Sequence, residues 1–127
     1  MFRTGIGIAM ALTASLGGPH LIWAADNNLA TQTLTVFAAK CARCHGPQLV
    51  KPKGRFGYVR DLARVAANRE MVVPSAPEES ELWDLVKRGE MPPPDSPTGA
   101  LSKAQKQIIR AWIAVGAPSK LNGLPGN

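Results

Sequence analysis

The spacing of apolar residues predicts helices that are separated by loops rich in glycine and proline. The first helix is expected over residues 30–43, where the apolar face consists of Leu34, Phe37, Ala38 and Cys41 at helical spacing. Gly46 and Pro47 then interrupt the pattern. Because no run of alternating apolar and polar residues predicts a strand, the pattern indicates an all-α domain.

Two further helices are expected in the middle of the chain. The shorter one covers residues 61–70, with Asp61 as its N-cap and an apolar side made of Leu62, Val65 and Ala66. The longer one covers residues 75–90, where Ser75 and Glu78 have the spacing of a capping box and Gly89 ends the helix. Its inner face is expected to consist of Leu82, Leu85 and Val86.

A proline-rich segment separates these helices from the last one. Residues 91–100 read MPPPDSPTGA, and their three consecutive prolines require an extended path. The last helix is expected within residues 101–118, with Ser102 and Gln105 as its capping box. Its apolar stripe consists of Ile108, Ile109, Trp112 and Ile113.

The first 25 residues have the composition of an export signal. Arg3 is the sole charge before Asp26, and the apolar stretch between them is short and rich in glycine. We therefore expect a signal peptide over 1–25, a domain over 26–118 and a loose tail over 119–127. No segment after residue 25 is long and apolar enough to be a transmembrane span. A leader that is retained would instead tether the protein to the membrane.

Positive charge is concentrated in one part of the chain. Without Arg3, fourteen basic and nine acidic residues leave a net charge of +5. Residues 40–69 hold eight of these bases against Asp61 alone, a net charge of +7. Such a block can steer an acidic partner, although a solvated basic face without a partner is an equal alternative. Nucleic acid is a weaker candidate because the sequence lacks the patterns of nucleic-acid binding.

The two cysteines of the chain lie within the sequence Cys41-Ala42-Arg43-Cys44-His45. Cys-x-x-Cys-His is the attachment signature of c-type haem, in which each thiol forms a thioether with one vinyl group of the porphyrin. The histidine that follows then binds the iron as its proximal ligand. A disulfide within this motif would close too small a loop to stabilise a domain.

Three other interpretations of the motif remain. A thioredoxin-like dithiol requires a βαβ context, which the pattern lacks. A zinc site requires about four ligands, but His45 is the only histidine after the expected leader, which contains His20. A chance match is the third, since short motifs carry false positives.

Two methionines could bind the other face of the iron. Met91 begins the rigid proline run directly after a helix stop, and we prefer it to Met71, whose neighbours indicate an ordinary core residue. Histidine–methionine ligation raises the reduction potential relative to bis-histidine ligation. The apolar shell of the haem, or the packing behind it, is expected from Phe37, Leu82, Leu85, Ile109, Trp112 and Ile113. The sequence does not decide whether the carbonyl group that orients the His45 ring belongs to Pro47, to Pro52 or to another residue.

Three sequence blocks together resemble the planctomycete-type cytochrome c domain, a branch of small monohaem, class I-like c cytochromes. The blocks are FAAKCARCHG, VVPSAPEESELWDLVKRGEMPP and LSKAQKQIIRAWIAVGAP, and the resemblance covers about residues 33–118. It implies a small helical bundle around one haem c, with its first and last helices crossing near Phe37 and Trp112. It also implies covalent attachment at Cys41 and Cys44, proximal ligation by His45, distal ligation by Met91 and attachment outside the cytoplasm.

The expected function is periplasmic transfer of single electrons, as a soluble carrier or as a small subunit of an oxidoreductase complex. Its partners are expected to be redox proteins with an acidic docking surface that meets the basic residues Arg43, Lys51, Lys53 and Arg55. The alternative function is a haem-based sensor or gas-binding module with a labile sixth ligand. No acid–base pair or nucleophile arrangement in the sequence indicates an enzyme.

Overall fold

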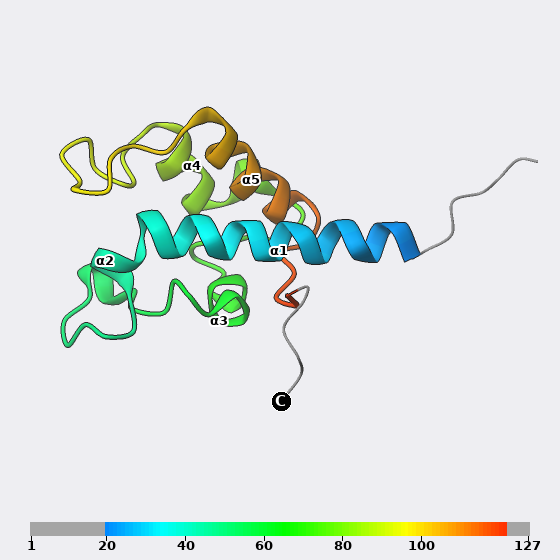
Figure 1. The fold of residues 1–127 in the computed structure, drawn as a ribbon, viewed down its shortest axis with the longest axis horizontal. Coiled ribbons are helices and arrows are strands. Elements are labelled where there is room, and N and C mark those ends of the chain that lie inside the picture. The colour runs from blue at the N-terminus through cyan, green and yellow to red at the C-terminus, as the bar shows by residue number, and fades with distance from the viewer. Residues whose placement is uncertain (1–19, 122–127) are drawn as a thin grey trace, which may run out of the picture.

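A computed structural model describes residues 20–121, with side chains from residue 28 onward, and this part of the chain contains helices and loops but no strand (Figure 1). The all-α prediction is therefore confirmed. Most of the expected leader, residues 1–19, and the end of the expected tail, residues 122–127, lie outside the described residues.

Five α-helices and two short 3-10 helices make up this range. They are α1 (His20–Lys40), α2 (Ala42–His45), η1 (Lys53–Arg55), α3 (Leu62–Ala67), η2 (Pro77–Glu79), α4 (Glu81–Lys87) and α5 (Lys103–Ala114). Within residues 20–121, none of the helices combines the length and apolar character that a membrane span needs.

Helix α1 is the central element of the fold. In Figure 1 it runs across the molecule with α4 and α5 on one side and α2 and α3 on the other, and its N-terminal end extends beyond them. It packs most extensively on α5. At this crossing the rings of Phe37 and Trp112 meet edge to face, with centroids 5.9 Å apart and planes at 84°. This contact confirms the crossing that the family resemblance implied.

The core lies between these two helices and the segments that cover them. Phe37, Ile109, Trp112 and Ile113 have no exposed surface. The indole N–H of Trp112 donates a hydrogen bond of 2.8 Å to the carbonyl oxygen of Pro118, so burial leaves no unsatisfied donor there. The stripe predicted for α5 is thus confirmed, except that Ile108 is only partly buried.

The first helix differs from its prediction in extent and in face. It begins at His20 rather than near residue 30 and ends at Lys40, with α2 as a separate turn. The buried positions of its described part are Ala30, Thr33, Val36 and Phe37, whereas Ala38 is exposed. The prediction for Ala38 is wrong because the buried face of α1 runs through Thr33 and Phe37, which are four residues apart, and Ala38 lies beside that face.

Two of the three predicted helix caps are confirmed. The Asp61 carboxylate accepts a hydrogen bond of 3.1 Å from the Arg64 amide at the start of α3. Ser102 and Gln105 form a complete capping box on α5, with both reciprocal bonds present.

The capping box predicted at Ser75 is wrong. Ser75 has a φ of +69°, and its amide donates to the carbonyl oxygen of Ile113 at 2.8 Å. Helix α4 begins only at Glu81, after the 3-10 turn η2. The Ser80 hydroxyl is buried and bonds to the backbone of Val73 and Ala76, so it ties the chain before α4 to the core.

These two serines give a matched test of the capping assignment. Ser102→Ala is expected to lower the free energy of unfolding by about 1 kcal/mol, because the Gln105 amide loses its partner. Ser75→Ala is expected to change it by less than about 0.5 kcal/mol, since Ser75 is exposed and caps nothing. Urea denaturation of both variants measures the difference, and equal losses would contradict the assignment.

Candidate functional site

A cavity lies at the C-terminal end of α1. Its volume is about 250 Å³, a little below the roughly 300–1,000 Å³ typical of ligand sites. Its walls come from the end of α1, from α2, from the loop around η1, from α4 and from the segment after Met91. All five residues that the sequence singled out line it: Cys41, Cys44, His45, Met71 and Met91.

The two cysteines are one turn apart on the same wall. Cys41 follows the end of α1, and its amide still donates to the carbonyl oxygen of Phe37 at 2.9 Å. The carbonyl oxygen of Cys41 accepts from the amides of Cys44 at 3.2 Å and His45 at 3.0 Å, so the backbone turns tightly through the motif. Both thiols are free and partly buried. They can therefore reach one edge of the same ligand.

The His45 ring is held in one orientation from behind. Its Nδ1 lies 2.8 Å from the carbonyl oxygen of Phe56 and donates to it, because a carbonyl can only accept. The Phe56 ring also packs edge-on to the imidazole, with centroids 5.4 Å apart. In the neutral imidazole this bond assigns the proton to Nδ1 and leaves the lone pair of Nε2 for a metal. The orienting carbonyl belongs to Phe56 rather than to Pro47 or Pro52, the two residues named from the sequence.

The two methionines reach the cavity from different segments. Met71 is partly buried and packs against the core, and its carbonyl oxygen accepts from the Leu82 amide at 2.9 Å. Met91 is 39% exposed, and its amide donates to the carbonyl oxygen of Leu85 at 3.2 Å. The bond from Met91 to Pro92 is cis. The geometry brings both thioethers to the same cavity, so the preference for Met91 stays a prediction.

The environment of Cys41 is unsuited to dithiol redox chemistry. Burial, and to a smaller extent the neighbouring Cys44, raises the pKa of the Cys41 thiol to about 11. Reactive thiols in Cys-x-x-Cys motifs have lowered pKa values, because the thiolate is the nucleophile. Residues 28–121, whose side chains the structure describes, also hold no group of three His, Cys, Asp or Glu residues that could bind a metal ion. Neither observation supports the dithiol or the zinc interpretation.

The six apolar residues expected at the cavity or behind it divide between these two places. Phe37, Leu82 and Leu85 line the cavity. The other three expected residues, Ile109, Trp112 and Ile113, are buried without lining it, so they pack behind the wall.

Among the lining residues that the sequence did not predict are Phe56, Val59 and Val86. Val86 is expected from the sequence on the inner face of its helix, but not in the wall of the cavity. Phe56 and Val59 lie in a loop without helical periodicity. The available signal was the aromatic pair Phe56 and Tyr58 around a glycine, and their rings do pack together with centroids 4.6 Å apart.

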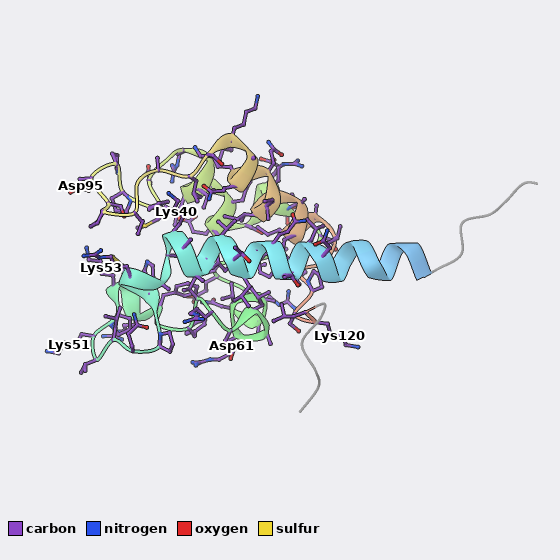
Figure 2. The ribbon with its side chains drawn as sticks, in the orientation of Figure 1. Lys40, Lys51, Lys53, Asp61, Asp95 and Lys120 are labelled. Atoms are coloured by element: carbon purple, nitrogen blue, oxygen red, sulfur yellow. The ribbon has the colours of Figure 1, made fainter. Side chains whose placement is uncertain are left out.

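Positive charge surrounds the cavity. Lys40, Arg43 and Lys53 line it, and Figure 2 shows Lys40, Lys51 and Lys53 at the same end of the molecule. Among the described residues, the ion pairs lie elsewhere and join Glu78, Asp84 and Glu90 to bases of α4 and α5 or next to them. Arg43 and Lys53 at the cavity are therefore available to an anionic ligand or partner, whereas the Lys40 ammonium donates to the carbonyl oxygen of Thr98.

The donor set fits a covalently attached haem. The walls are mainly apolar, two thiols lie one turn apart, and an imidazole with a free Nε2 adjoins them. The thioethers of Met71 and Met91 both line the cavity and are the two candidates for the second axial position. Cations at the rim suit the two carboxylates that a haem carries.

Comparison with known families agrees with this donor set. Residues 41–95 match the family model described as planctomycete cytochrome C. The matched segment begins at the first cysteine and ends four residues beyond Met91, so it contains all five candidate residues. The resemblance stated from the sequence is confirmed over this segment, which indicates a haem-based electron-transfer domain with haem c. No curated protein and no solved structure matches the chain.

Proposed function

We propose that this protein carries single electrons on one haem c, bound covalently through Cys41 and Cys44 and ligated by His45 and Met91. The observation that carries the proposal is the convergence of these four side chains on one apolar cavity, with the His45 ring fixed through Nδ1. When bound, the group supplies an iron that changes between the ferric and ferrous states by one electron.

Residues of the chain attach the haem, orient its proximal ligand and exclude water from it. Cys41 and Cys44 fix the ligand to the end of α1, so that it cannot be lost by dissociation. The Phe56 carbonyl keeps the His45 ring oriented and makes it a stronger donor. Phe37, Leu82 and Leu85 exclude water from one side of the cavity, which favours the less charged ferrous state.

Ligation by Met91 favours a carrier over a sensor. Iron that is held on both faces has no open position for a small molecule, so it transfers electrons without binding a gas. The 39% exposure of Met91 is the observation that favours the alternative, because an exposed ligand is more easily displaced. In that case the protein is a haem-based sensor or gas-binding module.

The proposed setting is the periplasm, after export by the N-terminal leader. There the protein acts as a soluble carrier or as a small subunit of an oxidoreductase complex, without catalytic activity of its own. A retained leader would tether it to the membrane. Copurification with a larger subunit at high salt separates the complex subunit from the free carrier.

The proposed partners are redox proteins with an acidic surface. The exposed residues Arg43, Lys51, Lys53 and Arg55 form what we call the cationic rim. Complementary charge accelerates encounter between proteins, and salt screens this effect over about 8–10 Å.

The first test of the function is a redox titration of the purified protein. We expect a reversible one-electron transition in the visible absorption of a haem. A protein without haem absorption, or one whose haem does not cycle reversibly, would contradict the proposed function.

The cationic rim can be tested by charge reversal. Lys51→Glu together with Lys53→Glu is expected to slow association with an acidic redox partner by about tenfold or more at low salt, and by much less at high salt. The matched control is Lys103→Glu with Lys106→Glu on α5, since no residue of α5 lines the cavity. Stopped-flow kinetics measure the rates. Equal slowing in both pairs, or no dependence on salt, argues against the rim as the docking surface.

A further inference from the structure

The segment that follows Met91 is fastened to the end of α1 by two reciprocal hydrogen bonds. The Lys40 ammonium donates to the carbonyl oxygen of Thr98. The Thr98 hydroxyl in turn donates to the carbonyl oxygen of Lys40 at 3.3 Å. These residues are 58 positions apart in the sequence, and both are partly buried. Figure 2 shows Lys40 between the loop that carries Asp95 and the loop that carries Lys51 and Lys53.

The Thr98 hydroxyl also belongs to a small network within its own loop. It lies 3.0 Å from the Ser96 hydroxyl. The Ser96 amide donates to the carbonyl oxygen of Pro93 at 2.9 Å, and the Gly99 amide donates to that of Ser96 at 2.9 Å. The loop is therefore folded into two consecutive turns, which end at Ser96 and Gly99, and Thr98 lies within the second turn. Contacts that hold Thr98 therefore also hold this second turn.

The proline run limits the other ways in which this segment can be held. Pro92, Pro93 and Pro94 have no amide hydrogen, so three consecutive residues donate no backbone hydrogen bond. On the side of α4, the Met91 amide is bonded to the Leu85 carbonyl. On the far side, the loop is joined to α1 by the hydrogen bonds between Thr98 and Lys40. The loop is thus a strap that is anchored at α4 and at α1.

The α1 anchor lies next to the attachment site. Lys40 directly precedes Cys41, and both line the cavity together with Met91, Pro92, Pro93 and Ser96. A single bonded pair therefore connects the backbone that carries the cysteines to the loop that carries the expected distal ligand. The ammonium is charged, and hydrogen bonds from charged donors are about twice as strong as neutral ones.

We propose that the Lys40–Thr98 pair is a latch that holds residues 91–99 against the end of α1 and so limits how often Met91 leaves the iron. The part that concerns iron rests on the proposed function, whereas the closure of the loop is a property of the chain itself. Lys40 and Thr98 are positioning residues, because they act on the ligand through the loop. In the wild-type protein the latch keeps Met91 in place despite its exposure to solvent.

The closure of the loop over residues 91–99 is tested by amide hydrogen exchange in the reduced holoprotein. Lys40→Leu removes one latch bond, and Thr98→Val removes the other together with the contact to the Ser96 hydroxyl. Each is expected to accelerate exchange of the Ser96 and Gly99 amides by about five- to tenfold. Thr98→Ser keeps the hydroxyl and should restore the wild-type rate. Lys51→Leu removes the same charge from an exposed position outside the cavity wall and should leave these amides unchanged.

The effect on the ligand is tested by carbon monoxide binding to the same reduced variants. Because the gas binds only when Met91 has left, its binding rate is expected to rise by the same five- to tenfold in Lys40→Leu and Thr98→Val. It should not rise in Thr98→Ser or Lys51→Leu. The reduction potential of each variant, measured alongside, shows whether the ligand set itself has changed.

The outcomes separate the latch from the proposed function. Unchanged amide exchange in both latch variants overturns the latch. Faster exchange with unchanged carbon monoxide binding overturns its control of Met91. Immediate carbon monoxide binding by the wild-type protein overturns Met91 ligation and with it the carrier function, while the exchange rates still decide whether the loop is latched.

Discussion

Replacing Cys41 and Cys44 together by alanine is expected to abolish the covalent attachment of haem. Both thioethers are lost, and only coordination by His45 and the apolar contacts remain to hold the ligand. The expected result is a chain from which acidified organic solvent removes all haem. The measurement is the absorbance of the protein fraction after extraction under denaturing conditions.

The single variants are the matched controls. Cys41→Ala and Cys44→Ala each leave one thiol on the cavity wall, so each is expected to keep a fraction of haem that solvent cannot extract. A double variant that retains haem after extraction as well as the wild-type protein does would contradict attachment through these two sulfurs.

The second large effect is expected from Met91→Ala. Loss of the distal thioether should lower the reduction potential by on the order of 0.1 V or more, within the roughly 0.8 V range that axial ligands span. The reduction potential is expected to fall because methionine ligation raises it. The vacated position should also allow rapid binding of carbon monoxide to the reduced protein. Redox titration and flash or stopped-flow kinetics measure the two effects.

Met71→Ala distinguishes the two methionines. Met71 packs against the core, so its truncation is expected to cost about 2 kcal/mol of unfolding free energy, toward the low end for a core methionine that is only partly buried. It should leave the reduction potential and the slow carbon monoxide binding unchanged. The reverse pattern, with the ligand effects in Met71→Ala alone, would assign the distal position to Met71.

Features that depend on neighbouring residues could be predicted from the sequence. The caps at Asp61 and Ser102 use hydrogen bonds between residues three positions apart, and both form as expected. The one-turn spacing of Cys41 and Cys44 has the same local origin. The pattern at Ser75 was equally local, but the backbone there is held by a bond to Ile113 on α5, and this tertiary contact prevents the helical start.

The parts of the site that depend on the path of a loop could not be predicted. Phe56 orients His45 from eleven residues away, across a loop that contains no periodic pattern. The pairing of Lys40 with Thr98 spans 58 residues and leaves no trace in the spacing of apolar positions. The start of α1 was missed because the expected boundary at residue 25 divided one continuous helix, His20–Lys40. Where the chain is cleaved stays a prediction.

Covalent attachment of haem is tested most directly by the intact mass of the purified protein under denaturing conditions. We expect a single species that carries one haem in addition to the polypeptide, and the same spectrum shows where the polypeptide begins. A polypeptide of unmodified mass, with any haem found only as a separate small molecule, would contradict covalent attachment.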